Sequence, residues 1–339
     1  MSGNSTINVA INGFGRIGRA VFKVLLEKSD KNIRIVAIND LTDIESLAYL
    51  LKYDSVYGEY GLKVEPAKNA LVVGGKKYKV LAEKEPSALP WKRLKADIVL
   101  ECTGLFRKKE DAEKHIRAGA SKVVISAPAK SDDVKTVVLG VNENNIKKTD
   151  KVVSMASCTT NCLAPVTDVL KKSFGIKKAI MTTIHSYTST QNIVDSPHPK
   201  DPRRARAAAV NMVPTSTGAA KATTKTIPAL DGYFDGMAVR VPTPVGSMCD
   251  ITYVMKKNVT EEKINKAFKK AAGKKGLKGI LETTEEPYVS SDIIGKSASA
   301  IVDLPLTKVI DGDLVKVIAW YDNEWGYSSR MADMVEYMR

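Results

Sequence analysis

The chain has 339 residues, of which 44% are hydrophobic, and it carries a formal net charge of +14 at pH 7. This length exceeds the usual size of a single hydrophobic core, so we expect two domains. No run approaches the roughly 20 apolar residues that a membrane helix needs, and the short polar start (1–6) predicts no secretory signal. Four cysteines are too few for a disulfide framework, and they form no Cys/His cluster, which favours a reducing cytoplasm and indicates no metal site.

The basic residues are spread along the chain and are densest at 263–278. An amphipathic helix with a solvated basic face accounts for that stretch. We do not expect nucleic-acid binding, because no basic motif interleaved with aromatic residues accompanies it. A positive field would attract phosphorylated substrates and dinucleotides.

The first 150 residues alternate between short apolar strands and amphipathic helices. We expect strands at 7–11, 33–38, 96–100 and 122–125, and helices at 16–27 and 108–118. Short buried strands separated by helices predict an α/β domain with a doubly wound parallel sheet. The segment 62–81 instead predicts a hairpin that turns at Gly74–Gly75.

The pattern changes after Val152, where strands become longer and helices fewer. We expect strands at 179–185, 236–241, 250–255, 298–303 and 314–321. These strands predict a catalytic α+β domain with a mixed, largely antiparallel sheet, and we place the two domains at 1–157 and 158–322. The long polar stretch between His185 and Asn211 is typical of a functional loop.

A glycine-rich turn follows the first strand. Gly13, Gly15 and Gly18 form G-x-G-x-x-G, the Rossmann-type fingerprint for a dinucleotide, and Asp40 follows Gly18 by 22 residues at the end of the second strand. The helix N-terminus offers N–H groups and a positive dipole end to the phosphates. A carboxylate at Asp40 would bind the ribose hydroxyls and repel a 2′-phosphate, which favours NAD over NADP. The alternative is a plain glycine turn with Asp40 capping the next helix.

Cys158 follows a strand (151–156) and begins an apolar helical run to Leu170. The helix dipole and free N–H groups there should lower the pKa of the thiol and make it a nucleophile. Pro165 should distort or delay this helix. Hydroxyl side chains suited to an oxyanion or a phosphate flank the cysteine: Ser157, Thr159 and Thr160.

The alternative reading makes Cys158 a small buried hydrophobe, as free cysteines often are. Its polar neighbours argue against that. Cys162 has the apolar neighbours Leu163 and Ala164, Cys102 and Cys249 lie on or near strands, and all three are predicted to be structural. A nucleophilic thiol needs a base, and the chain has three histidines. His185 ends a strand and is the best candidate. His115 lies in a charged helix and is predicted to face solvent, and His198 lies in the long loop.

These features come together in a family resemblance. Seven motifs carry it: NGFGRIGR (12–19), SCTTNCLAP (157–165), HSYT (185–188), RRARA (203–207), PTSTGAAK (214–221), MAVRVPTP (237–244) and WYDNEWGY (320–327). The chain closely resembles phosphorylating glyceraldehyde-3-phosphate dehydrogenase nearly from end to end. The resemblance implies that Cys158 attacks the aldehyde and that His185 acts as the base while hydride leaves for NAD, in glycolysis or gluconeogenesis. Inorganic phosphate then releases an acyl phosphate, 1,3-bisphosphoglycerate, from a thioester.

The resemblance also implies two phosphate sites. Thr188 and Arg240 resemble members of the substrate-phosphate site. The site for the attacking phosphate would contain Ser157, Thr159, Thr217 and Gly218, with Arg204 nearby. Arginine suits phosphate because its planar fork donates two bonds at once. Alternatively, Arg240 makes an ordinary salt bridge and Thr217–Gly218 caps a helix.

For the cofactor, the resemblance places five further residues at the site: Arg16, Ile17, Thr103, Ser126 and Asn323. It also implies a C-terminal helix (323–339) that packs back on the first domain, and a homotetramer with the long loop at subunit contacts. Two departures concern the cofactor. Ser196–Pro197 replaces the Leu-Pro of many NAD-specific members, which allows NADP use beside NAD, and Lys84 replaces an arginine near the adenine.

Other functions remain open at this stage. The paired phosphate sites argue against an aspartate semialdehyde dehydrogenase, while an erythrose-4-phosphate dehydrogenase differs at few residues. A redox-sensing or nucleic-acid-binding protein that keeps the fold without turnover should lack the nucleophile or the base. Both are present here, so that reading survives only as a secondary activity.

Overall fold

The computed structural model describes residues 6–338, which divide into two compact units. Unit 1 comprises the described residues up to Val137, residues 144–156 and those from Ser328 onward, and unit 2 comprises 138–143 and 157–327. The predicted bounds differ at 138–143, at Ser157 and at 323–327, all of which belong to unit 2. A Cβ added to Gly140, whose φ is +82°, would lie 2.7 Å from Leu277 Cδ2, so this segment packs within unit 2.

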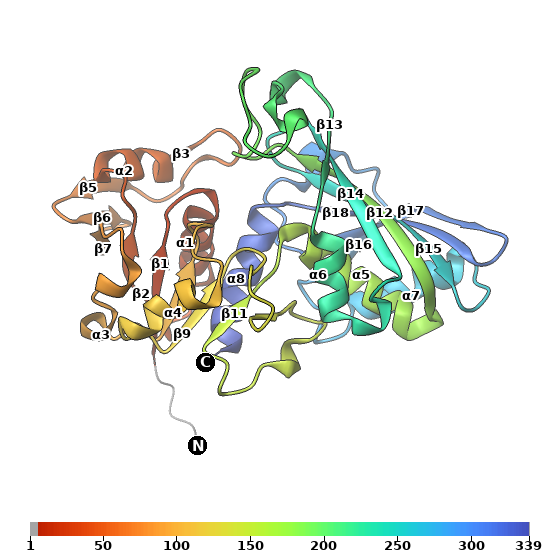
Figure 1. Ribbon diagram of the computed structural model, residues 1–339, viewed down its shortest axis with the longest axis horizontal. Coiled ribbons are helices and arrows are strands. Elements are labelled where there is room, and N and C mark those ends of the chain that lie inside the picture. The colour runs from red at the N-terminus through yellow and green to blue at the C-terminus, as the bar shows by residue number, and fades with distance from the viewer. Residues whose placement is uncertain (1–5, 339) are drawn as a thin grey trace. The chain divides into compact units, whose positions relative to one another are not determined.

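Unit 1 contains a nine-stranded sheet in the order β10-β11-β9-β8-β1-β2-β7-β6-β5 (Figure 1). From β10 to β7 the neighbouring strands are parallel, and β5, β6 and β7 pair antiparallel. The strands are β1 (Ile7–Asn12), β2 (Ile33–Asn39), β5 (Val64–Ala67), β6 (Ala70–Val73), β7 (Lys76–Leu81), β8 (Ile98–Glu101), β9 (Lys122–Ile125), β10 (Lys135–Thr136) and β11 (Val152–Ser154), beside the separate pair β3 (Tyr53–Asp54) and β4 (Gly58–Glu59). This confirms the doubly wound parallel sheet.

Unit 1, in its described residues, contains four α-helices that lie between its strands in the chain, and most of the C-terminal helix. They are α1 (Arg16–Lys28), α2 (Ile44–Lys52), α3 (Trp91–Leu94), α4 (Lys109–Arg117) and the greater part of α8 (Trp325–Tyr337). One apolar core lies between the sheet and α4, and the fully buried Trp91 belongs to it. Near the end of α8, Lys28 Nζ contacts Asp333 and Glu336 at 2.5 and 2.6 Å.

The predicted hairpin is confirmed between β6 and β7. Gly74 and Gly75 in its turn have φ of +57° and +79°. Positive φ at both central positions matches the right-handed twist of the flanking strands and favours glycine. A third strand, β5, extends this hairpin on its other side.

Unit 2 contains a seven-stranded, mostly antiparallel sheet in the order β13-β14-β12-β15-β18-β17-β16. The strands are β12 (Ile176–Ser186), β13 (Val213–Ser216), β14 (Phe234–Val241), β15 (Ser247–Met255), β16 (Leu281–Thr284), β17 (Ala300–Ile310) and β18 (Leu314–Tyr321). Its parallel pairs are β12–β14 and β16–β17, which confirms the mixed sheet. Helices α5 (Cys158–Phe174), α6 (Ala219–Thr226) and α7 (Glu261–Ala272) contact its strands (Figure 1).

Short 3₁₀ helices occur in both units. They span Pro86–Ala88, Glu143–Asn145, Pro202–Ala205, Ala208–Val210, Pro228–Leu230 and Ser290–Ile293. Two of them interrupt the polar stretch that follows His185, so this stretch is a folded loop.

Two local predictions are wrong. Helix α5 runs through Pro165 without a break, because every residue from Thr159 to Leu170 is buried and tertiary packing outweighs the lost N–H donor. His115 on α4 is fully buried rather than exposed. Its charged neighbours face outward, while the imidazole donates and accepts hydrogen bonds inside unit 1.

Candidate active site

A cavity of about 670 Å³ lies at the carboxyl ends of the unit 1 strands. Here β2 and β8 flank β1 on opposite sides, and ligands of doubly wound sheets bind where the strand order reverses in this way. The cavity is lined by Asn12, Gly13, Gly15, Asn39, Asp40, Leu41, Glu83, Lys84, Glu85, Cys102, Thr103, Leu105 and Phe106. Five predicted cofactor residues therefore line one cavity: Gly13, Gly15, Asp40, Lys84 and Thr103.

The three fingerprint glycines meet different surroundings. A Cβ on Gly13 (φ +91°) would lie 2.7 Å from the Thr103 amide nitrogen, and one on Gly18 would lie 2.1 Å from Gly13 O. A Cβ on Gly15 would meet nothing within 4 Å. Gly13 and Gly18 thus serve the close packing of turn, strand and helix, whereas Gly15 leaves open space at the N-terminus of α1 for a pyrophosphate.

Two alanine substitutions should separate these roles. Gly18→Ala should destabilise the fold by about 1–3 kcal/mol, because its Cβ overlaps a backbone oxygen that cannot move alone. Gly15→Ala, at an ordinary φ of −70°, should leave the melting temperature unchanged. It should instead weaken NAD binding roughly tenfold by filling the space that the pyrophosphate needs. Thermal melts and NAD titrations of both variants check this, and equal effects of the two on both readouts would contradict it.

Asp40 serves the turn as well as the cavity. Its Oδ2 accepts a hydrogen bond from the Phe14 amide at 2.6 Å, and its Oδ1 accepts one from the Thr42 amide at 3.0 Å. The capping alternative is wrong, because Asp43 and not Asp40 is the N-cap of α2, where its Oδ1 accepts from the Ser46 amide at 2.7 Å. The Arg16 side chain forms an ion pair with Asp54 at 2.6 Å. Four other predicted cofactor residues are not among the described residues that line the cavity: Arg16, Ile17, Gly18 and Ser126.

In unit 2, Cys158 is the first residue of α5. Ser157 is the N-cap, and its Oγ accepts a hydrogen bond from the Thr160 amide at 3.0 Å. Directly before it, Ala156 has a φ of +54°. This left-handed conformation is strained for alanine and produces a sharp turn into the helix. Nothing in the sequence signals that strain, because a glycine would be the usual choice there.

His185 lies beside the cysteine at the end of β12. Its Nε2 is 3.4 Å from Cys158 Sγ, and the residue is 3% exposed. In the parallel register of β12 and β14, His185 pairs with Arg240, and Arg240 Nη1 lies 2.6 Å from His185 Nδ1. Nδ1 also lies 2.7 Å from the Ser186 carbonyl oxygen. Arg240 can only donate, and its Nη1 also lies 3.0 Å from the same carbonyl oxygen. When Arg240 Nη1 and His185 Nδ1 both donate to that carbonyl, the Nε2 lone pair faces the thiol and can accept its proton.

The electrostatics of this pair correct one expectation. Burial raises the pKa of the Cys158 thiol to about 11, although the Arg240 charge and the Thr159 hydroxyl and amide act to lower it. Burial and Arg240 together lower the pKa of His185 to about 3. The helix N-terminus therefore does not by itself produce a free thiolate, since desolvation outweighs it. At neutral pH the pair therefore consists of a neutral thiol beside a neutral imidazole.

Tyr321 is a member of this site that the motif reading missed. Its hydroxyl lies 2.9 Å from Thr159 Oγ1 and 2.8 Å from Thr183 Oγ1, and its ring meets the His185 ring edge-on at 5.9 Å. Tyr321 ends β18, two strands away from β12 in the sheet. Only the strand order brings the Tyr321 hydroxyl to Thr159, the residue that follows Cys158.

The remaining predicted phosphate residues make their hydrogen bonds locally. Thr188 bonds Gln191, and Arg204 donates to Thr215 Oγ1 at 2.9 and 2.7 Å. Thr217 Oγ1 accepts from the Ala219 amide at 3.2 Å, and Gly218 is the N-cap of α6, so the two residues form a helix start as the alternative expects. Gly218 has open space on its Cβ side. Arg240 differs, because its buried Nε has no hydrogen-bond partner within residues 6–338.

Asn323 is 6% exposed at the end of β18. Its Oδ1 accepts hydrogen bonds from the Gly246 amide at 3.2 Å and from Ser247 Oγ at 3.0 Å. Both bonds use the oxygen, so the carboxamide presents its Nδ2 hydrogens to any further partner.

The other cysteines occupy different settings. Cys162 and Cys249 are buried, whereas Cys102 is partly exposed and lines the unit 1 cavity, and all four cysteines are free thiols. Within the described chain, no group of three or more His, Cys, Asp or Glu side chains could hold a metal ion. Among residues 6–338, no helix combines the length and hydrophobicity that a membrane span requires.

A dinucleotide-type cavity in one unit and a Cys–His pair at a helix N-terminus in the other are the features of an NAD-dependent dehydrogenase. Residues 7–109 match the family described as glyceraldehyde 3-phosphate dehydrogenase, NAD binding domain, and residues 157–323 match its C-terminal domain. The chain therefore belongs to the glyceraldehyde-3-phosphate dehydrogenase family.

Curated relatives of the same name agree over nearly the whole chain. The glyceraldehyde-3-phosphate dehydrogenase of Streptomyces coelicolor is 53% identical over 334 residues, covering 98% of both chains. That of Geobacillus stearothermophilus is 53% identical over 333 residues, covering 98% of both chains. That of Thermotoga maritima is 54% identical over 328 residues, covering 97% of this chain and 98% of its own. These matches favour glyceraldehyde 3-phosphate over the other substrates considered from the sequence.

Proposed function

We propose that this chain oxidises D-glyceraldehyde 3-phosphate to 1,3-bisphosphoglycerate with NAD and inorganic phosphate, with Cys158 as nucleophile and His185 as base. The observation that carries the assignment of roles is the 3.4 Å contact between Cys158 Sγ and His185 Nε2 at the N-terminus of α5. A thiol beside an imidazole with a free lone pair can be ionised at the moment of attack.

The reaction then proceeds through a hemithioacetal and a thioester. The thiol proton moves to His185 Nε2 while Sγ forms a bond to the aldehyde carbon, and the carbonyl oxygen takes up the proton to give a hemithioacetal. Nε2 next accepts the hydroxyl proton as the carbon loses hydride, which leaves a thioester. NAD, when bound, supplies the hydride acceptor. An oxygen of hydrogen phosphate finally attacks the thioester carbon and the phosphate proton passes to solvent. The Cys158 thiolate leaves and regains a proton from the imidazolium.

Anion binding is assigned by the chemistry of the donors. Arg240 is proposed to bind the substrate phosphate with Thr188, because its buried Nε has no partner in the described chain and can donate to an anion. Ser157 and Thr159 at the start of α5, together with Thr217 and Gly218 at the start of α6 and with Arg204, are proposed to bind the attacking phosphate. Helix N-termini favour such anions.

The cofactor residues are proposed on the fit of the unit 1 cavity. Gly15 leaves open space at the N-terminus of α1, and Asp40 lines the same cavity as Lys84 and Thr103. We further assign Arg16, Ile17, Gly13 and Gly18 to the pyrophosphate turn, Ser126 to the sheet edge, and Asn323 to the nicotinamide amide.

Reduced-cofactor absorbance tests this function. Purified protein with glyceraldehyde 3-phosphate, inorganic phosphate and NAD should produce it, and omission of phosphate should slow turnover strongly. We expect NAD to be used better than NADP because of Asp40, and parallel assays with NADP measure how far Ser196–Pro197 relaxes that preference. Faster oxidation of erythrose 4-phosphate than of glyceraldehyde 3-phosphate would overturn the substrate assignment.

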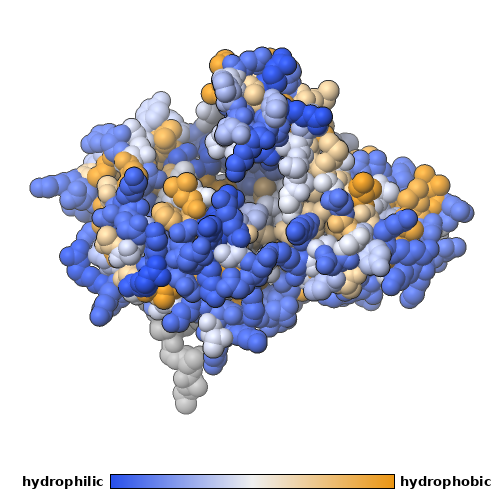
Figure 2. Space-filling view, in the orientation of Figure 1, coloured by the Kyte–Doolittle hydropathy of each residue, from blue (hydrophilic) through white to orange (hydrophobic). Residues whose placement is uncertain are grey.

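We also propose a homotetramer in the cytoplasm. One groove of about 420 Å³ on the unit 2 sheet is lined by apolar side chains that include Tyr233, Val254 and Leu314. Ile180 lines the same groove and is 62% exposed. Figure 2 shows hydrophobic patches over the strands at the right of the view. A second copy of the same sheet face would cover this apolar surface.

Ile180→Asp should therefore disrupt the assembly. A charge in the centre of an apolar contact is costly unless it is paired, so sedimentation velocity should show a smaller species than for the unchanged protein. Lys266→Glu, an exposed change on α7, is the matched control and should leave the assembly intact. If Ile180→Asp sediments as the unchanged protein does, this face is not a subunit interface.

A further inference from the structure

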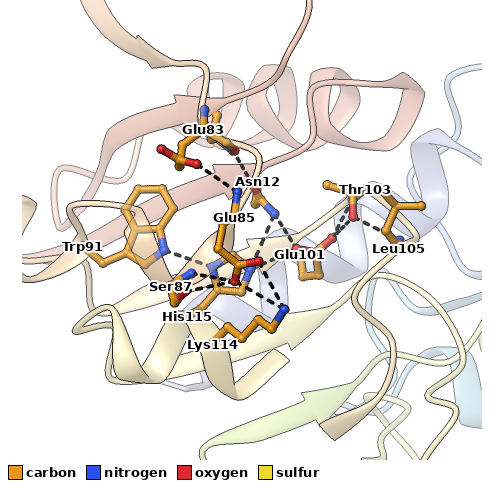
Figure 3. A network of polar contacts seen from close by, with 11 residues as sticks. Asn12, Glu83, Glu85, Ser87, Trp91, Glu101, Thr103, Leu105, Lys114 and His115 are labelled. Atoms are coloured by element: carbon orange, nitrogen blue, oxygen red, sulfur yellow. Dashed lines mark hydrogen bonds and ion pairs between the residues drawn. The ribbon is translucent and has the colours of Figure 1, made fainter. Parts of the chain in front are cut away.

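A buried polar network lies inside unit 1, behind the cavity at the strand ends (Figure 3). Its centre is Glu101, the last residue of β8, which is 1% exposed. His115 and Trp91 are fully buried beside it, and Asn12 is 1% exposed. A buried carboxylate is costly unless hydrogen bonds satisfy it, so its partners define its role.

Trp91 determines the tautomer of His115. The indole Nε1–H can only donate, and it lies 3.0 Å from His115 Nδ1, which must accept. The proton of the neutral imidazole is therefore on Nε2, and Nε2 donates to Glu101 Oε2 at 3.1 Å. In this way a purely structural indole orients a donor toward the carboxylate.

Glu101 accepts from donors on both oxygens. Besides the imidazole, Oε2 accepts from Asn12 Nδ2 at 2.6 Å. Oε1 accepts from the Thr103 amide at 2.8 Å and from the Thr103 hydroxyl. All four partners are placed to donate to the carboxyl oxygens of Glu101.

The partners of Glu101 are also walls of the cavity. Asn12 and Thr103 line it, and Asn12 Oδ1 accepts from Asn39 Nδ2 at 2.7 Å. Asn39 in turn bonds the Glu83 backbone through both side-chain atoms at 2.9 Å. The network thus connects the ends of β1, β2 and β8 with the loop after β7.

The glycine turn rests on the same structure. Gly13 approaches the Thr103 backbone so closely that a Cβ would lie 2.7 Å from its amide nitrogen. That amide is the one held by Glu101 Oε1. A shift of Thr103 therefore moves the surface against which the turn packs.

We propose that Glu101, oriented by His115, is a positioning residue for dinucleotide binding: it fixes Asn12, Thr103 and the Gly13 turn in the geometry that receives the cofactor. The inference rests on the proposed placement of NAD in this cavity. Glu101 itself is sealed behind Asn12 and Thr103, so it acts through them and does not touch the cofactor.

Glu101→Gln is the direct test on the full-length enzyme. Either orientation of the carboxamide turns its NH₂ toward two donors, so Asn12 or Thr103 loses its fixed position. The KM and the dissociation constant for NAD should rise about tenfold or more, while kcat at saturating NAD changes by less than about twofold. His115→Phe keeps a buried ring but removes the Nε2 donor, and it should raise both constants about threefold or more.

Asn8→Ala is the matched control for a merely structural effect. Asn8 is a buried polar residue at the other end of β1, where it donates to Lys95 O at 2.7 Å and accepts from Arg34 Nε at 2.9 Å. It should lower the melting temperature but leave the NAD constants unchanged. If Glu101→Gln does not fold, the KM and the dissociation constant for NAD of His115→Phe test the positioning role instead.

The outcomes separate the two proposals. If Asp40→Ala leaves NAD binding unchanged, the placement of NAD in this cavity fails. If Asp40→Ala weakens NAD binding while Glu101→Gln and His115→Phe bind NAD as the unchanged enzyme does, the placement stands and the positioning role is overturned. A fall in kcat with an unchanged KM for NAD would also overturn it.

Discussion

Cys158→Ala should abolish turnover, with kcat falling by about 10⁴-fold or more, because no other group can form the thioester on which the hydride step depends. The side chain that remains can neither bond the aldehyde carbon nor exchange a proton with His185. Stability should change little, since Cys158 starts a helix whose cap is Ser157. Stopped-flow absorbance at saturating substrate measures the residual rate.

Cys162→Ala is the control for this prediction. Cys162 lies one turn later on α5, fully buried, with its Sγ 3.8 Å from Ala319 O. Its removal should lower the melting temperature and leave the rate per folded enzyme near that of the unchanged protein. If Cys158→Ala still turns over, or if a folded Cys162→Ala has lost turnover, Cys158 is not the nucleophile.

His185→Asn should lower kcat/KM by about 10²- to 10⁴-fold, the usual contribution of a positioned general base. The base accepts the thiol proton and later the hydroxyl proton, so both steps suffer. His198→Asn is the control, because His198 Nδ1 only accepts backbone hydrogen bonds from Lys200 and Asp201 within the long loop. It should keep full activity.

Alkylation of Cys158 adds a pH test to this variant. With His185 present, the thiol proton can pass to Nε2, so alkylation should proceed at neutral pH. Without it the proton must leave to solvent, and burial raises the pKa of the thiol to about 11. The rate in His185→Asn should therefore be low at neutral pH and rise as pH approaches that value. If the ratio of the alkylation rates of the unchanged protein and His185→Asn does not vary with pH, the thiol proton does not pass to His185.

Local signals predicted much of the cofactor half. The period of apolar residues identified the strands of the parallel sheet, and G-x-G-x-x-G identified the turn after β1. Each glycine then has the steric environment that its position in the motif requires. These features depend on neighbouring residues in the chain, so a single sequence contains them.

Other features depended on distant residues. The charged helix around His115 suggested a solvent-exposed imidazole, yet Trp91 and Glu101 enclose it. Tyr321 reaches Thr159 only because β18 follows β15 and β12 in the sheet order. The positive φ of Ala156 is imposed by its flanking strand and helix, and alanine has no preference for it.

By itself, then, the sequence determined the two types of sheet, the family, the glycine turn and the identity of the cysteine–histidine pair. The tertiary structure decided which groups surround that pair and how they share its protons: the parallel register that brings Arg240 to His185, and the burial that opposes a free thiolate. Covalent neighbours determine strands, turns and caps, whereas desolvation and contacts across a sheet depend on residues far apart in the chain.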